Sequence, residues 1–194
     1  MDIPHPTPST GTMTGSDKLF IVFLILILGL VTWLGSMNYH EGQKEEETKR
    51  NGEAWLAWFT DMGGKRHADD FPADHPCSPQ SKPDLSPTHI KEGKPITGTW
   101  GPCLAQAMTE SSLKDLKNPF SQQALNLVES CDAKNHKLSG SLVLEEMSPT
   151  PAGSPVPFVN SSLADLDPID HKLQVRITVC NKGGGPIRIG EVEF

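Results

Sequence analysis

The chain has 194 residues, of which 24 are acidic and 17 are basic, and its formal net charge is −7 at pH 7. Proteins that bind nucleic acid neutralise phosphates with a basic surface; this sequence has no basic stripe, so we expect no nucleic-acid partner. Beyond one apolar run near its beginning, the chain is long enough for a single domain of ordinary size.

The first segment, residues 1–17, is predicted to be a disordered head. It has proline at positions 4, 6 and 8 and many small polar residues, a composition that buries too little apolar surface to fold. The membrane orientation that the four cysteines indicate places this head in the cytoplasm.

Residues 18–38 are predicted to form one transmembrane helix. The run from Leu19 to Met37 has no charged residue, and as a helix it would measure about 28 Å, close to the thickness of a bilayer core. A cleaved signal peptide is the alternative, but the run is long for one and no typical cleavage site follows it. No second run approaches this length, so we expect a single-pass signal anchor in the lipid bilayer.

The orientation of this span depends on cysteine more than on charge. One lysine precedes the span and three basic residues follow it closely, so the positive-inside rule gives little help. All four cysteines follow the span, in a region rich in proline, which suits disulfides in an oxidising compartment. We therefore expect a cytoplasmic N-terminus and a periplasmic or extracellular C-terminal domain.

Residues 39–64 are predicted to continue as a helix that is first polar and then amphipathic. In the polar part, Glu45 precedes Lys49 by four residues, and Glu46 precedes Arg50 by four. This order favours ion pairs on a solvated helix.

The amphipathic part begins at Ala54. Its large apolar side chains recur at helical spacing: Trp55, Trp58, Phe59 and Met62. This aromatic stripe is either the core-facing side of a docked helix, which we favour, or an interaction surface for a partner. Gly63 and Gly64 predict the end of the helix, and Gly42 or Gly52 predicts a bend.

Residues 65–98 are predicted to form a long Pro-rich loop. The segment has six prolines and no apolar periodicity. Loops of this length are usually functional, disordered or stapled, and Cys77 and Cys103 bracket most of this one.

The remaining residues, 99–194, are predicted to fold as an α+β domain with a small antiparallel sheet. Short helices are expected over 104–117 and 121–130. A first strand is expected over 138–145, and a Pro-rich connection follows it.

A C-terminal β-hairpin is expected to complete the sheet. Apolar and polar residues alternate from Leu173 to Cys180, which predicts a half-buried strand, and residues 181–185 predict the turn. In the return strand the alternation shifts phase at Gly190, as a β-bulge would require. Phe194 is expected to pack in the core.

The four cysteines allow three disulfide connectivities, and the sequence alone leaves them open. We favour Cys77–Cys103 with Cys131–Cys180, because this pairing staples the two segments that are least self-supporting. Each bond would stabilise the fold by roughly 3–4 kcal/mol on the loop-entropy estimate. There is no C-x-x-C motif, which is the usual signature of redox catalysis and of zinc ribbons.

Two acidic segments are candidate metal sites. The segment from His67 to Cys77 holds two histidines and three aspartates, but its spacing places them on no common face, so a solvated loop is favoured. Asp165, Asp167 and Asp170 offer carboxylates to Ca²⁺, which tolerates irregular loops, although Asp-Pro turns are common. Calcium is thus the one candidate cofactor, and no cofactor is the simpler expectation.

Catalytic motifs are missing from the sequence: it has no nucleophile elbow, no phosphate-binding P-loop and no H-E-x-x-H. We therefore expect a protein that is not an enzyme. Asn160 begins a glycosylation sequon, which matters only in a eukaryotic secretory protein.

The order of these parts resembles that of type IV pilins and type II secretion pseudopilins. Both have an apolar N-terminal helix with an amphipathic continuation, a connecting loop and an antiparallel sheet near the C-terminus. The resemblance implies an inner-membrane anchor that packs in the core of a filament. It also implies that Cys131–Cys180 is the pilin disulfide and that residues 165–170 are a calcium loop like that of some pseudopilins.

The chain departs from the pilin leader pattern in two places. Ser16 follows Gly15, where pilins have an aromatic residue, and Phe20 stands where they have glutamate. We therefore expect, more broadly, a membrane-anchored structural or assembly domain, either a pilin-like subunit or an accessory subunit, with protein partners or self-association through its N-terminal helix. The alternative is a ligand-sensing or metal-binding ectodomain.

Overall fold

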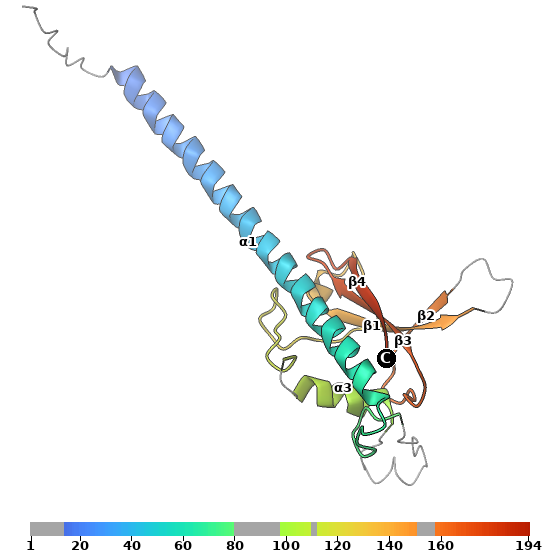
Figure 1. The fold of residues 1–194 in the computed structure, drawn as a ribbon. Helices are drawn as coiled ribbons and strands as arrows, with labels where there is room; N and C mark the ends of the chain where they lie inside the picture. Colours follow the sequence, from blue (N-terminus) through green and yellow to red (C-terminus); the bar gives the residue numbers. More distant parts are fainter. Residues whose placement is uncertain (1–13, 80–97, 110–111, 151–157) are drawn as a thin grey trace, which may run out of the picture. The chain divides into compact units, whose positions relative to one another are not determined.

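The structure is a computed structural model that describes residues 14–79, 98–109, 112–150 and 158–194. It divides into two compact units, Met1–Gly42 and Gln43–Phe194, and we describe each by itself. The elements in chain order (Figure 1) are α1 (Gly15–Arg66), α3 (Trp100–Thr109), η1 (His136–Leu138), β1 (Leu142–Pro149), β2 (Phe158–Ser162), β3 (Gln174–Cys180) and β4 (Pro186–Glu193). A long apolar helix followed by a small antiparallel sheet confirms the predicted α+β class.

Two predicted segments fall largely outside the described residues. Residues 1–13 of the head are among these, and α1 begins at Gly15, where the Asp17 amide donates to Thr14 Oγ1 at 3.4 Å in a capping-box arrangement. Of the Pro-rich loop predicted over 65–98, residues 65 and 66 belong to α1, residues 67–79 form mainly turns and bends, and residues 80–97 lie outside the described residues.

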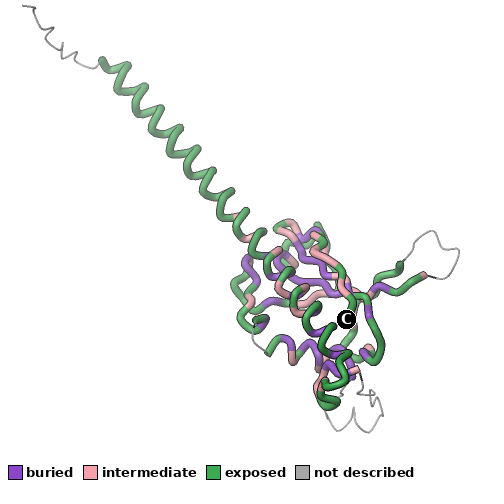
Figure 2. Tube along the Cα trace, in the orientation of Figure 1, coloured by how far each residue is buried: buried purple, intermediate pink, exposed green. Residues whose placement is uncertain are grey.

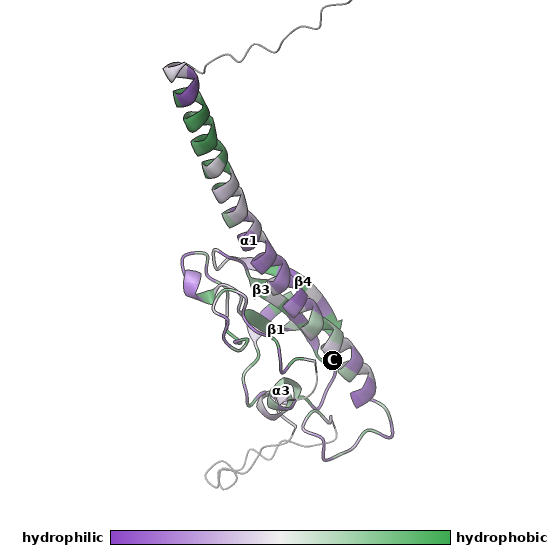
Figure 3. Cartoon of the chain, turned by 90° about the vertical axis from the view of Figure 1, so that its left-hand side faces the viewer, coloured by the Kyte–Doolittle hydropathy of each residue, from purple (hydrophilic) through white to green (hydrophobic). Residues whose placement is uncertain are grey.

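In the first unit, α1 carries an apolar stretch whose side chains are all exposed. Every residue from 14 to 40 is exposed (Figure 2), including the predicted span from Leu19 to Met37, and Figure 3 shows the most hydrophobic turns in green. Among the residues that the structure describes, α1 is the one helix long and apolar enough to cross a membrane. Such a surface is unfavourable in water and favourable in lipid, which fits a membrane anchor.

In the second unit, one side of α1 is buried in the domain core. The buried residues are Thr48, Asn51, Gly52, Trp55, Phe59, Met62, Gly63 and Arg66. Their spacing places them on one face of the helix. On the other face, Lys49 lies 4.0 Å from Glu45 and 2.9 Å from Glu46, so Glu46 pairs with Lys49 where the sequence predicted Arg50.

The glycines of α1 do not interrupt the helix. The end predicted at Gly63 and Gly64 is wrong, because α1 is continuous to Arg66. The bend at Gly42 or Gly52 stays a prediction. Gly52 lets the helix approach the sheet closely, since a Cβ atom there would lie only 2.6 Å from Cγ1 of Ile189. A glycine in a helix therefore marks a close packing contact here.

The four strands form one antiparallel sheet in the order β2-β1-β3-β4. Between β3 and β4 the register shifts: Ile177 pairs with Gly190 and Thr178 pairs with Arg188, so that Ile189 is the extra residue. This shift confirms the predicted β-bulge and the C-terminal hairpin.

The two faces of the sheet differ in character. The face that packs with α1 carries buried apolar side chains: Leu142, Leu144, Val175, Ile177 and Val179. The intervening residues point to the other face, which we call the outer face, and three of them there are Glu145, Arg176 and Arg188. Phe194 is fully buried, as predicted from its sequence.

Two elements have other bounds than the sequence predicted. The first short helix, expected over 104–117, is observed as α3, which ends at Thr109, and its later part forms turns. The strand expected over 138–145 begins only at Leu142, because η1 occupies Leu138 and Gly140 adopts a φ of 76° in the turn between them. A glycine at this φ interrupts the extended backbone.

The prediction of a second short helix over 121–130 is wrong. The side chain of Asn118 holds a turn there, because its Oδ1 accepts hydrogen bonds from the amides of Phe120 (2.9 Å) and Ser121 (3.3 Å). Further on, the Val128 amide donates to the Leu142 carbonyl at 2.9 Å. The backbone groups that a helix would have paired internally are thus bonded to the start of β1.

Replacing Gly52 with alanine should destabilise the fold. Alanine is the better helix former by about 1 kcal/mol, but its methyl group would overlap Ile189 and Val179, and such overpacking costs about 1–3 kcal/mol. Gly64 is the matched control, because a Cβ atom there meets nothing within 4 Å. Urea unfolding of the full chain in detergent, followed by tryptophan fluorescence, should give a lower midpoint for Gly52→Ala than for Gly64→Ala; equal midpoints would contradict this packing.

Candidate functional site

The aromatic stripe of α1 lies in the core of the second unit. Phe59 is fully buried, and its ring centroid lies 5.7 Å from that of Trp100 and 5.2 Å from that of Phe194, both edge-on. Trp55 is also buried, and Trp58 is half-buried and stacks on Phe194 at 6.0 Å. Such pairs contribute energy beyond the area they bury.

The stripe therefore faces the core, which is the interpretation that the sequence favoured. The alternative, an interaction surface, fails for Trp55, Phe59 and Met62, because these side chains are at most 9 % exposed. Only Trp58 keeps part of its surface accessible. A partner that binds this helix must use other residues.

At the end of α1, Arg66 is a charged residue buried within this aromatic core. It is 1 % exposed, its guanidinium lies 4.2 Å from the ring centroid of Phe194, and its Nη2 donates to the carbonyl of Ile169. Its Nε and Nη1 have no hydrogen-bond partner among the residues that the structure describes. Burial lowers the pKa of Arg66 to about 10, against the opposing field of Asp170.

Both disulfides form, and with the connectivity that the sequence favoured. Cys77 is bonded to Cys103 with their Cα atoms 4.6 Å apart, and Cys131 is bonded to Cys180 at 5.4 Å. The first bond ties the turns after α1 to α3, and the second ties an irregular segment to the end of β3. No cysteine of the chain is left free.

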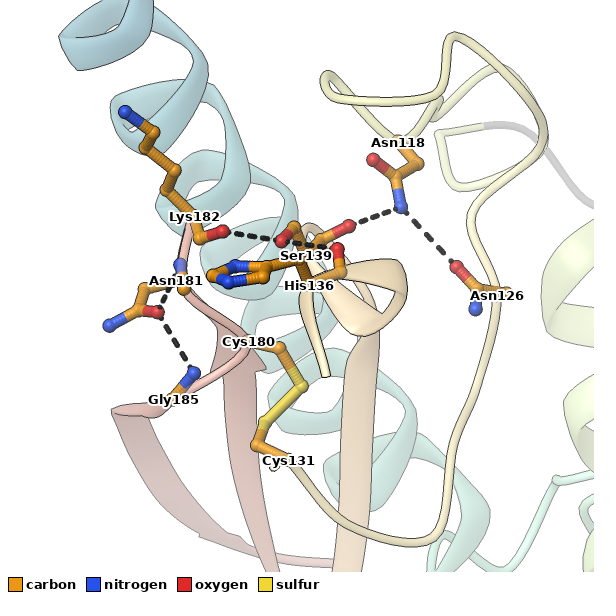
Figure 4. Close-up of a disulfide and its surroundings, with 10 residues drawn as sticks. Asn118, Asn126, Cys131, His136, Ser139, Cys180, Asn181, Lys182 and Gly185 are labelled. Carbon is orange, nitrogen blue, oxygen red and sulfur yellow. Dashed lines mark hydrogen bonds between the residues drawn. A yellow bond between two sulfur atoms is a disulfide. The ribbon is translucent and has the colours of Figure 1, made fainter. Parts of the chain in front are cut away.

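Short polar contacts surround the Cys131–Cys180 bond (Figure 4). Asn181 Oδ1 accepts from the amides of Gly183 (2.8 Å) and Gly185 (2.9 Å), which holds the β3–β4 turn. Ser139 Oγ lies 2.6 Å from the carbonyl oxygen of Lys182 and so joins this turn to the loop before β1. The disulfide and these contacts hold residues from three separate segments together.

A cavity of about 380 Å³ opens on the outer face, next to this disulfide. Its lining comprises Ser130, Cys131, Val143, Glu145, Arg176, Thr178, Pro186 and Arg188. Both cation and carboxylate side chains therefore border one hollow. The volume lies within the usual range of small-molecule sites, about 300–1,000 Å³.

The candidate calcium ligands do not come together. Asp167 accepts from the Ala164 amide at 2.7 Å, Asp170 contacts His171 at 3.0 Å, and Asp165 offers its backbone carbonyl to Gly101. Over the described parts of the chain, no three His, Cys, Asp or Glu side chains gather as metal ligands. The Asp167 carboxylate thus serves a local turn, as carboxylates of Asp-Pro segments commonly do.

Two features of the site were missed in the sequence. Arg66 follows the predicted end of the helix, in the segment predicted to be a loop, and no sequence pattern indicates its burial. The outer-face charges carried a signal, because Arg176 falls on the polar phase of the alternation in β3, but its neighbours could not be known without the strand register.

The buried charge of Arg66 leads to a test of what this side chain contributes. Arg66→Ala should lower the free energy of unfolding by about 2–4 kcal/mol, because it leaves a cavity against Phe194. Arg66→Met fills that space without a charge that must be desolvated, so it should cost less than about 1 kcal/mol or stabilise the protein.

Both variants lose the charge and the hydrogen bond to Ile169, so the difference between their free energies of unfolding reports packing alone. Urea unfolding of the full chain at pH 7 measures these free energies. If Arg66→Met lost as much stability as Arg66→Ala, the guanidinium itself would be stabilising and this account would be wrong.

Comparisons with known proteins found no family model, no curated protein and no solved structure that matches this chain. Any functional conclusion therefore depends on the residues and geometry described above.

Proposed function

We propose that this chain is a single-pass membrane-anchored protein whose disulfide-stapled domain has a structural or assembly role outside the cytoplasm, without enzymatic activity. The observation that carries the proposal is the exposed apolar stretch from Leu19 to Met37. A soluble protein rarely exposes an apolar surface of this extent.

The second unit is a domain that folds around its own core. Its face of α1, its sheet and its aromatic cluster bury one another, and the two disulfides close its irregular segments. Disulfides persist in oxidising compartments, which supports a periplasmic or extracellular position for this unit and a cytoplasmic position for the N-terminus.

The assembly role is supported by what α1 leaves available to a partner. Its aromatic stripe is used inside the domain, so contact through this helix would involve the apolar stretch within the bilayer. Resemblance of the sequence order to pilins and pseudopilins supports a pilin-like subunit, and an accessory subunit of a membrane complex is the broader form of the same role. Helix association in lipid depends on close packing.

A ligand-binding ectodomain is the second candidate function. The observation that favours it is the charged cavity on the outer face, since the aspartates from 165 to 170 do not gather as calcium ligands.

Thiol labelling in sealed membranes of known sidedness tests the orientation. Because all four cysteines are in disulfides, a membrane-impermeant maleimide should label none of them before reduction. After reduction it should label them from the extracytoplasmic side. Ser16→Cys is the control, and it should be labelled only when the membrane is permeabilised. Labelling of the native cysteines only after permeabilisation would place the domain in the cytoplasm.

Cysteine scanning of the span tests assembly. Single replacements at Ile25, Leu28 and Val31 should cross-link in membranes to a second copy or to one defined partner, with a helical periodicity along the scan. Gly64→Cys, in the second unit, is the control and should stay monomeric. A monomer at every position of the span would overturn the assembly role and leave the anchor in place.

A further inference from the structure

We propose that the outer-face cavity binds a short zwitterionic peptide, with the carboxylate of the peptide at Arg188 and its ammonium group at Glu145. This inference goes beyond the proposed anchoring role. Three features support it: the charges at the two ends of the cavity, the distance between the residues that carry these charges, and the fixed walls of the cavity.

The end of the cavity at β4 is positive. Arg176 directs both Nε (2.9 Å) and Nη2 (2.8 Å) to the same oxygen of Glu191, and Arg188 Nη2 donates to that oxygen as well. Two guanidinium groups thus share one carboxylate, which leaves a net charge of about +1. The side chain of Arg188 is 58 % exposed, against 21 % for Arg176, so Arg188 is the group that an anion can reach.

The end of the cavity at β1 is negative. Glu145 lies directly opposite Arg176 in the β1–β3 register, yet Arg176 turns to Glu191 on the other side. The carboxylate of Glu145 makes no hydrogen bond or ion pair with another residue that the structure describes. The cavity is therefore dipolar, and a ligand with a single negative charge would meet repulsion at this end.

The separation of Glu145 and Arg188 sets the scale of the ligand. The two residues stand two strands apart, about 9.6 Å, and are offset by two residues, about 6.8 Å, so their Cα atoms are roughly 12 Å apart. An extended tripeptide spans about 10–11 Å, which is comparable to this separation.

The walls of the cavity are held in place before any ligand arrives. Val143 and Thr178 form its floor and are only 3 % and 7 % exposed. The Cys131–Cys180 bond fixes the side wall to β3. Ser130 and Thr178 add hydroxyl groups to the lining, and a preorganised site spends little free energy on ordering itself.

Trialanine is the probe that tests this proposal. Isothermal titration of trialanine into the full chain in detergent should show binding, and blocking either end, with an N-acetyl group or a C-terminal amide, should weaken it about fivefold. A fivefold change is the size expected of one exposed ion pair.

Variants assign each end of the peptide to its residue. Arg188→Gln should weaken trialanine binding about fivefold, and this variant should bind trialanine and its C-terminal amide equally well. Glu145→Gln should bind trialanine and its N-acetyl form equally well. Lys172→Gln is the matched control, because Lys172 forms an exposed pair with Glu193 away from the cavity. Thermal unfolding verifies that each variant is folded, and Arg188→Met replaces Arg188→Gln if the latter is not.

Three results would overturn the proposal: no binding of trialanine at about 10 mM, equal binding of the doubly blocked peptide, or unchanged end preference in the two variants. None of these results affects the membrane anchor, which depends on α1 alone.

Discussion

The close approach of α1 to strands β3 and β4 is the contact on which the second unit depends. It is possible because Gly52 has no side chain at the point where Val179 and Ile189 face the helix. Three residues later the same face presents Trp55, and four residues after that it presents Phe59, to a buried aromatic cluster. The helix must lie close to the sheet for these rings to pack, so one small residue controls the burial of several large ones.

This contact also gives the two faces of the sheet different environments. Because the helix covers one face, the apolar phase of β1 and β3 is fully used within the domain, and the polar phase is left to solvent on the outer face. Charged residues collect there, and the Cys131–Cys180 bond holds an irregular segment beside them. The cavity is thus a consequence of the same packing that forms the core.

The sequence predicted those elements whose signals are local. Alternation gave β3, the phase shift gave the bulge near Gly190, and an uncharged apolar run gave the first part of α1. It failed where tertiary contacts override local preference: residues 121–130 resemble a helix but bond to β1, and Gly52 resembles a break but is a packing contact. The neighbours of Glu145 and Arg188 depend on strand register, which no local pattern specifies.

Arg66 shows how far the core tolerates a departure from apolar packing. Its guanidinium is desolvated by burial, which lowers its pKa, and its contacts are one carbonyl and one aromatic face. A planar, weakly hydrated cation suits such a place better than an ammonium group would. Because Ile169 and Phe194 come from segments on either side of β3, this single side chain joins the end of α1 to both. A charge that costs desolvation energy can thus still specify how the last turn of the helix docks.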